Sequence, residues 1–443
     1  MKLMTLAFTA MLLASPAAIH AAGVAPSLGA RADNIRSFAS ANGIGESNVV
    51  PVGSANSVMR RLAAPSGPNH TVALEKERFP SYFPPFSWDR VPVYQQFGEP
   101  DRLLTDEEIA QIASTTDFIT IEKSQGYKIF GASDLGAKHV IARFKALKPG
   151  TKCLFYFNSA YAYPYETDSK MFTPQNIFEE KYKIFRSFLL TYPKTDEPRV
   201  RVRDGVYEFD VLNPQFRTWW AETVGKYVRE TGADGLFVDQ MHGFAFLRPK
   251  KKSEVEKAQA EMMRMAKKAI GPNKILLLNN AAQIPELFEI GDAFMFEHYN
   301  ASLLTKENIL QDWMLMKKIS RARKITVWRI GVNLENRHPD QLSKRDGATD
   351  GEYASLAKKR LPFYLAAFLI GAQPYSYFQY GWGWGLQTGL LAEYSEFNKP
   401  LGKPLGEYTR PDPNGWVFRR EFEHASVWVD LDTRKGKIQW KQS

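Results

Sequence analysis

Cysteine is almost absent from this sequence, in which Cys153 is the single thiol among 443 residues. One cysteine cannot form an intrachain disulfide. Cys153 sits in the apolar run KCLFYF, which predicts a buried side chain rather than a nucleophile. The fold is therefore expected to form without disulfide cross-links.

Long apolar runs are also missing after the N-terminus. The best candidate, LPFYLAAFLIGA at 361–372, is shorter than the roughly 20 residues that cross a bilayer, and it contains Pro362. A buried helix explains this run better. We therefore expect no membrane span in the body of the chain.

The motifs of several other protein classes are absent. The sequence has no HExxH or HxxxH pair, no Gly-rich phosphate loop after an early strand, and no basic helix with interleaved aromatics. We therefore expect no cofactor and no nucleic-acid partner. A metal site is the weaker alternative, and its ligands would be Asp239, His242, Glu297 and His298.

The chain is basic, with a formal net charge of +10. Much of this charge lies in the runs RPKKK (248–252) and RARK (321–324), which are typical of solvated helix ends and loops. A substrate that is anionic or belongs to the cell envelope is the alternative explanation.

The N-terminus has the layout of a secretory signal peptide. Lys2 precedes the apolar run LMTLAFTAMLLA, and small residues follow up to Ala21 and Ala22. The run is too short for a membrane anchor, so we expect residues 1–22 to be cleaved and the protein to be secreted or periplasmic. Residues 23–75 are rich in Ala, Ser, Gly and Asn, which predicts a flexible linker.

The remaining chain alternates short apolar runs with helical patterns. Capping-box sequences at Thr105 and at Ser253 mark the expected N-termini of two of these helices. Continuous apolar strands that alternate with helices indicate a parallel sheet, and eight of them indicate an α/β fold of the (β/α)₈ TIM barrel type. The eight expected strands lie at 91–98, 117–126, 152–159, 234–240, 275–280, 292–300, 325–332 and 373–382.

Two segments depart from this alternation. From about residue 405 the chain has β-like runs around a Gly-containing turn, which predicts a C-terminal β appendage at 405–443 after a barrel at 76–404. The connection at 160–210 is long and rich in Tyr, Phe and Pro, so we expect it to be ordered and functional.

Reactive groups of such barrels project from the carboxyl ends of the strands. Two carboxylates stand at these ends, Asp239 after GLFV and Glu297 after AFMF. The two strands are two apart in the barrel, so both side chains can reach one cavity. A carboxylate pair in a cavity is what glycoside hydrolysis requires, because one group protonates the departing oxygen and the other attacks the sugar or activates water. We therefore predict Asp239 and Glu297 as catalytic residues, with Asp239 ionised and Glu297 as the acid.

Other side chains near the strand ends could contact a sugar through hydrogen bonds or ring stacking, although each of them could also be structural. The predicted substrate-binding residues are Glu122, Asn158, Tyr161, His242, Asn279, His298, Trp328, Arg329, Tyr377 and Trp382. Of these, His242 and His298 are candidates for tuning the carboxylate pair.

Three stretches of the chain resemble known glycosidases. The segment YEFDVLNPQFRTWWAETVGKYVRETGADGLFVDQ (207–240) is similar to one found in many (β/α)₈ glycosidases, and FMFEHY (294–299) resembles the strand with the second acid in barrels related to endo-α-1,4-galactosaminidases. The closing GWVFRREFEHASVWVDLDTRKGKIQW is similar to the tail of glycosyl-hydrolase-like families. The resemblance implies a (β/α)₈ glycoside hydrolase in which Asp239 and Glu297 are catalytic.

Together these patterns predict an exported glycoside hydrolase that cleaves a polysaccharide or oligosaccharide. Two alternatives stay open at this point. A polysaccharide lyase would use the basic residues to neutralise a uronate, and a non-catalytic glycan-binding barrel would use the aromatics alone.

Overall fold

The computed structural model describes residues 79–192, 195, 197–198, 206–241, 248–298, 301, 304–332 and 350–441. All of them belong to one compact unit, Ser66–Ser443. The expected signal peptide and linker at 1–75 lie outside the described residues. No helix in the described ranges is long and apolar enough to cross a membrane.

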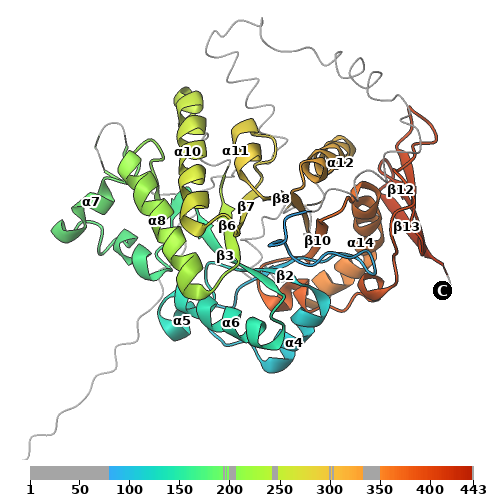
Figure 1. The fold of residues 1–443 in the computed structure, drawn as a ribbon, viewed down its shortest axis with the longest axis horizontal. Coiled ribbons are helices and arrows are strands. Elements are labelled where there is room, and N and C mark those ends of the chain that lie inside the picture. Colours follow the sequence, from blue (N-terminus) through green and yellow to red (C-terminus); the bar gives the residue numbers. More distant parts are fainter. Residues whose placement is uncertain are drawn as a thin grey trace, which may run out of the picture. The chain divides into compact units, whose positions relative to one another are not determined.

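Eight parallel strands form the centre of the fold, as the sequence predicted (Figure 1). A parallel bridge between Val93 and Phe378 joins the two edges of the sheet, where the Tyr94 N–H donates to the Phe378 carbonyl at 3.0 Å. The sheet therefore closes into a barrel. In spatial order the strands are β1 (Gln95–Phe97), β2 (Phe118–Ile121), β3 (Lys152–Asn158), β6 (Gly235–Asp239), β7 (Ile275–Asn279), β8 (Ala293–His298), β9 (Ile325–Gly331) and β10 (Ser376–Gly381).

Helices connect consecutive strands and cover the outside of the barrel (Figure 1). This (β/α)₈ arrangement confirms the predicted fold class. After β10 the chain forms only two short helical turns, Leu386–Leu390 and Ser395–Asn398. The connecting helices are α4 (Asp106–Thr115), α5 (Tyr127–Phe130), α6 (Ser133–Leu147), α8 (Pro214–Thr231), α10 (Lys252–Ile270), α11 (Pro285–Ile290), α12 (Lys306–Arg321) and α14 (Asp350–Gly371).

One of the two expected capping boxes is present. Thr105 and Glu108 exchange side-chain and backbone hydrogen bonds at the start of α4. The box expected at Ser253 is wrong, because α10 already begins at Lys252 and Ser253 lies inside its first turn. The lysines that precede Ser253 form salt bridges with Glu254 and Glu256, and these bridges offset the unfavourable placement of cations at a helix N-terminus.

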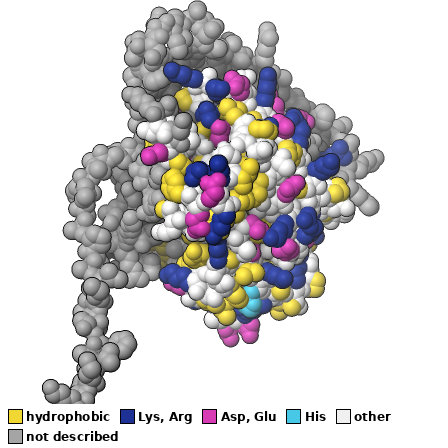
Figure 2. All heavy atoms as spheres, turned by 90° about the vertical axis from the view of Figure 1, so that its left-hand side faces the viewer, with side chains coloured by type: hydrophobic (Ala, Val, Ile, Leu, Met, Phe, Trp, Pro, Cys, Tyr) yellow, Lys and Arg dark blue, Asp and Glu magenta, His cyan; other side chains and the backbone are white. Residues whose placement is uncertain are grey.

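The basic runs lie at helix ends, as the sequence indicated. RPKKK leads into α10, and RARK closes α12, where cations interact favourably with the helix dipole. Figure 2 shows the face around α7 (Lys183–Arg186) and α8, on which basic and acidic side chains are interspersed. Ion pairs such as Arg217–Glu261 and Lys226–Asp168 account for some of this mixing.

Side chains along each strand alternate between the barrel interior and the layer under the helices. At the amino-terminal end of the strands the interior is apolar. Residues that precede β1 cover this end, where Phe86 lies 4.9 Å from the Tyr375 ring and 5.8 Å from the Tyr377 ring. The aromatic floor of the barrel, as we call this cluster, consists of Phe83, Phe86, Phe118, Tyr375 and Tyr377.

The long connection after β3 is ordered over its described residues. It pairs β4 (Tyr161–Ala162) with β5 (Tyr207–Glu208), and it contains the helical turns Thr167–Phe172, Glu180–Tyr182 and α7. Its aromatic residues pack against one another and against α8, with Phe172, Phe185 and Phe188 all in contact with Trp219. Packing therefore explains much of the aromatic content of this segment.

The C-terminal antiparallel sheet confirms the predicted β appendage. It consists of β11 (Val417–Glu421), β12 (Ala425–Asp430) and β13 (Lys435–Trp440), and it packs on α14. The buried Arg420 guanidinium donates to the carbonyls of Leu369 and Ile370, both at 3.1 Å, and to that of Ala372. These are carbonyls that the end of a helix leaves unpaired. Arg420 thus fastens the appendage to the last turn of α14.

Candidate active site

At the carboxyl ends of the strands, the side chains that face the barrel interior are polar instead of apolar. Most of these side chains are buried, and they connect to one another or to neighbouring backbone by hydrogen bonds. The polar ring, as we call this layer, consists of Gln96, Glu122, Asn158, Asp239, Asn279, Glu297, Arg329 and Gln379. The ring therefore includes both predicted catalytic residues and four of the predicted substrate-binding residues.

The strand that ends at Asp239, β6, packs very closely on β7. A Cβ atom at Gly235 would lie 2.0 Å from the Ile275 carbonyl oxygen, so only glycine fits there. From Gly235 the strand alternates, with Phe237 and Asp239 facing inward. Gln240 follows in the left-handed region with φ of 61°, a conformation that costs energy for a non-glycine residue. This bend ends the strand directly behind the carboxylate.

The Asp239 carboxylate accepts hydrogen bonds from four groups. The Tyr156 hydroxyl donates at 2.5 Å and the Gln240 N–H at 2.7 Å. The amide nitrogens of Asn279 and Asn158 donate at 3.0 and 3.4 Å. Donors surround this nearly buried group, which provides the solvation that an anion loses when it leaves water.

Asn279 links the two carboxylates. Its Nδ2 atom donates to Asp239 Oδ1 at 3.0 Å and to Glu297 Oε2 at 2.8 Å. Because one nitrogen binds both oxygens, these two oxygens cannot lie farther apart than the sum of the two distances, 5.8 Å. The structure thus brings Asp239 and Glu297 together.

Tyr156 was not predicted from the sequence, although it contributes the shortest of these hydrogen bonds. It lies two residues before Asn158 on β3, so both side chains face inward. Burial and the nearby charges of Asp239 and Glu122 raise the pKa of the Tyr156 phenol well above its ordinary value. The phenol therefore remains neutral and donates its proton to the hydrogen bond with Asp239.

A third carboxylate of the ring, Glu122, directly follows β2. Glu122 accepts from the Gln96 amide at 2.9 Å and from Lys123 Nζ at 3.0 Å. Burial by itself lowers the pKa of Lys123, but the charges of Glu122 and Asp239 outweigh it and raise this pKa above its ordinary value. Lys123 is therefore a cation near Asp239, and its Nζ lies 5.0 Å from the Tyr156 ring centre. The sequence identified Glu122 but not the role of Lys123.

The rest of the ring combines a stacked cation with buried acceptors. The Arg329 guanidinium lies 4.1 Å from the Trp384 ring centre and donates to the Gly383 carbonyl at 3.3 Å. Asn279 Oδ1 and Gln379 Oε1 are buried and accept no hydrogen bond within the part of the chain that the structure describes. Two buried acceptors of the ring thus have no protein donor among the described residues.

A protein-family model with the description "hypothetical glycosyl hydrolase family 15" matches residues 145–426, more than half of the chain. The chain belongs to this family. It is therefore a glycoside hydrolase. The matched residues begin just before β3 and include Tyr156, Asp239, Asn279 and Glu297.

The solved structures to which this chain is similar have low identity to it. The glycoside hydrolase domain of PelA from Pseudomonas aeruginosa is 13% identical, covers 58% of this chain and 89% of its own, and has a TM-score of 0.38. Ega3 of Aspergillus fumigatus in complex with galactosamine is 12% identical, with coverages of 70% and 97% and a TM-score of 0.41. Amy13B of Eubacterium rectale is 9% identical, with coverages of 80% and 89% and a TM-score of 0.45. No curated protein matches the sequence significantly.

Three aromatic candidates lie outside the polar ring. Trp328 is fully buried on the outer face of β9, where its indole N–H donates to Asp312 at 2.7 Å. Tyr377 belongs to the aromatic floor at the opposite end of the barrel. Trp382 is buried and stacks on Tyr353, with ring centres 6.0 Å apart. The structure thus places these three residues in the core, not beside the carboxylate pair.

The described candidate histidine, His298, does not join the carboxylates either. His298 follows Glu297 on β8, so its ring turns outward, where Nε2 lies 2.7 Å from Asp312. His242 lies outside the described residues. Tyr161 remains close to the ring, because its backbone N–H donates to the Asn158 side chain at 2.8 Å.

The described residues contain no ligand set for the metal site that the sequence left as an alternative. These residues contain no group of three or more His, Cys, Asp or Glu side chains that could hold a metal ion. His298 uses its Nε2 for Asp312, and Asn279 occupies the space between Asp239 and Glu297.

Proposed function

We propose that this glycoside hydrolase acts on a polysaccharide or oligosaccharide, with Asp239 and Glu297 as its catalytic pair. The observation that carries the proposal is the Asn279 bridge, which holds the two carboxylates within reach of one glycosidic bond. We further propose that the protein is exported, on the basis of its N-terminal sequence.

The spacing of the pair favours hydrolysis with retention of configuration. Retaining enzymes hold the two carboxyl groups about 5 to 5.5 Å apart, whereas inverting enzymes need roughly 6.5 to 9.5 Å to fit a water molecule. The bridged oxygens of Asp239 and Glu297 are at most 5.8 Å apart. The gap therefore matches direct attack by one carboxylate better than attack by an intervening water.

The hydrogen bonds suggest which carboxylate has which role. Asp239 accepts four hydrogen bonds, which suits an ionised nucleophile, so we assign it the attack on the anomeric carbon. Glu297 protonates the leaving oxygen as the glycosidic bond breaks. A water molecule then releases the sugar from Asp239 while Glu297 takes the water's proton, which restores both groups.

Other members of the polar ring fit substrate binding in this scheme. The Asn279 and Gln379 side chains carry both donor and acceptor atoms, the two kinds of group that bind sugar hydroxyls. Lys123 and Arg329 already interact with Glu122 and Trp384, so they do not by themselves require an anionic glycan. An anionic or cell-envelope substrate stays a prediction from the charge of the sequence.

The stereochemistry of the first product tests the proposal. The purified protein is screened on a panel of polysaccharides, and the anomer released from a cleaved substrate is followed by ¹H NMR before it mutarotates. We expect the anomer of the substrate to be retained. An inverted product would contradict Asp239 as the nucleophile, and cleavage that persists at a normal rate in Asp239→Asn would contradict the pair itself.

A further inference from the structure

Lys123 follows Glu122 at the carboxyl end of β2, and the proposed reaction gives it no role. Its Nζ atom lies 3.0 Å from Glu122 Oε2. The same atom lies over two aromatic rings, 5.0 Å from the ring centre of Tyr156 and 5.7 Å from that of Tyr163. A carboxylate and two tyrosine rings thus surround this ammonium group, which ring faces attract.

Neutralising Glu122 is one reason for a cation at this place. The Glu122 side chain is 5% exposed, and a buried carboxylate without a partner is costly. This reason does not explain why the ammonium group also lies against Tyr156. The Tyr156 hydroxyl donates to Asp239 Oδ2 at 2.5 Å. Lys123 therefore packs on the residue that forms the shortest of the hydrogen bonds to Asp239.

The order of the strands puts Lys123 on the Asp239 side of the barrel. Lys123 follows β2, and β6, which ends at Asp239, is the second strand from β2. Glu297 lies on β8, the fourth strand from β2 in either direction and thus on the opposite side of the closed barrel. The cation of the polar ring, Arg329, lies on β9 next to β8. Lys123 should therefore act on Asp239 more strongly than on Glu297.

The interaction between Lys123 and Asp239 is mutual. Burial by itself lowers the pKa of Lys123, but the charges of Glu122 and Asp239 raise it above its ordinary value. Lys123 is therefore a permanent cation near neutral pH. The attraction that keeps the proton on Lys123 favours the ionised form of Asp239 to the same extent. Glu122 acts in the opposite direction, because a negative charge disfavours a second anion nearby.

We propose that Lys123 is a positioning residue that keeps Asp239 ionised for its attack on the sugar, and that Glu122 limits this effect. The inference rests on the proposed role of Asp239 as the nucleophile. Lys123 itself forms no bond and transfers no proton in the reaction. The two side chains together set the pH at which Asp239 becomes ionised.

The ionisation of Asp239 can be followed without a substrate. Protein labelled with ¹³C at the aspartate side-chain carboxyls is titrated by NMR, and the signal that Asp239→Asn lacks belongs to Asp239. Lys123→Met should raise the midpoint of this titration by about one pH unit, the effect of removing a nearby opposite charge. Glu122→Gln should lower the midpoint. Lys123→Arg keeps the charge and should keep the midpoint of the wild type.

Kinetics give a second readout on any polysaccharide that the protein cleaves. The acidic limb of the pH profile of kcat/KM should move in the same directions as the NMR midpoint, to higher pH in Lys123→Met and to lower pH in Glu122→Gln. The other titratable and charged groups around Asp239, Glu122 and Lys123 stay unchanged in these variants, and they are Tyr94, Tyr156, Tyr163, Glu297 and Arg329.

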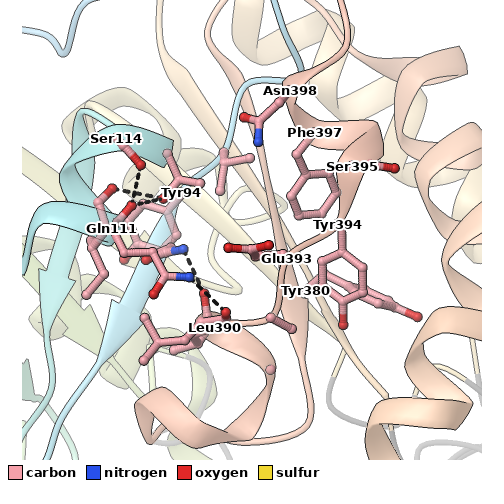
Figure 3. Close-up of a pocket in the computed structure, with 17 residues that line it drawn as sticks. Tyr94, Gln111, Ser114, Tyr380, Leu390, Glu393, Tyr394, Ser395, Phe397 and Asn398 are labelled. Atoms are coloured by element: carbon pink, nitrogen blue, oxygen red, sulfur yellow. Dashed lines mark hydrogen bonds between the residues drawn. The ribbon is translucent and has the colours of Figure 1, made fainter. Parts of the chain in front are cut away.

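Two controls remove the same charges at other places. Lys145 Nζ lies 2.5 Å from Asp234, which precedes β6 at the amino-terminal end of the barrel, and its side chain is 27% exposed, against 26% for Lys123. Glu393 lines a cavity on the outer side of β1 (Figure 3). Lys145→Met and Glu393→Gln should both leave the midpoint of Asp239 unchanged.

The direction of the two shifts decides the proposal. Lys123→Met leaves Glu122 without its cation, so its melting temperature should fall. Glu122→Gln keeps the cation and tests the proposal independently of that loss. Midpoints that stay constant, or that move in the same direction in both variants, would make Lys123 only the partner of Glu122. Normal turnover in Asp239→Asn would instead contradict the catalytic pair, and it would leave the titration result intact.

Discussion

The two ends of the barrel interior are built from the same strands but have opposite chemistry. The aromatic floor packs rings face to edge and in one stacked pair, and these contacts stabilise the fold; the ring centres of Phe118 and Tyr377, for example, lie 5.3 Å apart. The polar ring places carboxylates and amides in a hydrogen-bonded layer at the other end. A strand of this barrel thus contributes a stabilising residue at its start and a chemically active one at its end. Substitutions at the two ends should therefore damage different properties.

The largest expected effect is on turnover, at the ring. Asp239→Asn and Glu297→Gln should each lower kcat by about 10² to 10⁴ or more, because each removes a group that gains or loses a bond in the reaction. The melting temperature should change little, since the amides keep the shape of the carboxyls. Glu254→Gln, an exposed neutralisation on α10, is the control for charge. Near-normal kcat in either variant would assign that carboxylate a structural role.

The next effect is on stability, at the floor. Tyr377→Ala should lower the free energy of unfolding by about 3–5 kcal/mol, the typical cost of emptying a large aromatic site in a core. The folded fraction should keep the KM of the wild type, because Tyr377 lies at the end of the barrel away from the carboxylates. Chemical denaturation and steady-state kinetics measure the two quantities. A raised KM with unchanged stability would move Tyr377 back to the substrate site.

A smaller effect, on kcat/KM, is expected at Tyr156, which lies next to the polar ring inside the barrel. Tyr156→Phe removes one hydrogen bond to the Asp239 carboxylate, and hydrogen bonds to charged groups contribute about 1.5–3 kcal/mol. We expect kcat/KM to fall about 10- to 100-fold. Tyr94→Phe is the matched control, because its hydroxyl also lies inside the barrel but donates to Thr120 at 2.6 Å. Equal losses in both variants would show that Tyr156 acts through packing.

An effect that depends on pH comes from a buried acid outside both regions. Burial raises the pKa of Glu166 to about 8 in the folded chain. Between its ordinary value near 4.3 and this value, the folded chain holds a proton that the unfolded chain has lost. Stability should therefore be full below about pH 4.3 and fall as pH rises toward 8, by at most about 1.4 kcal/mol per pH unit. Glu166→Gln should flatten this part of a stability profile measured by denaturation, and an unchanged slope would contradict the assignment.

The fold and the carboxylate pair could be predicted from the sequence because both depend on local patterns. Eight apolar runs specified eight strands, and a carboxylate directly after such a run has to lie at a strand end. The structure confirms the strands and brings Asp239 and Glu297 together, while their catalytic roles stay a prediction.

The errors among the candidates follow from alternation along the strands. Trp328 and Arg329 were expected at one site, and so were Glu297 and His298, but adjacent residues of a strand face opposite sides. Because Arg329 and Glu297 face inward, the residues next to them, Trp328 and His298, must face the helices. There both rings interact with the Asp312 carboxylate. The same rule could have found Tyr156 from Asn158. The end of the barrel at which Tyr377 lies depends on strand register, which no local pattern specifies.

The Arg420 contacts also have a consequence for the order of events during synthesis. Burial lowers the pKa of this arginine to about 10, so it stays charged at neutral pH. The charged guanidinium donates hydrogen bonds to the carbonyls at the end of α14. Helix α14 leads directly into β10, the strand that closes the barrel. A ribosome that has just released β10 has not yet released Arg420. In a nascent chain, the carbonyls at the end of α14 can therefore gain their arginine partner only after β11 has emerged.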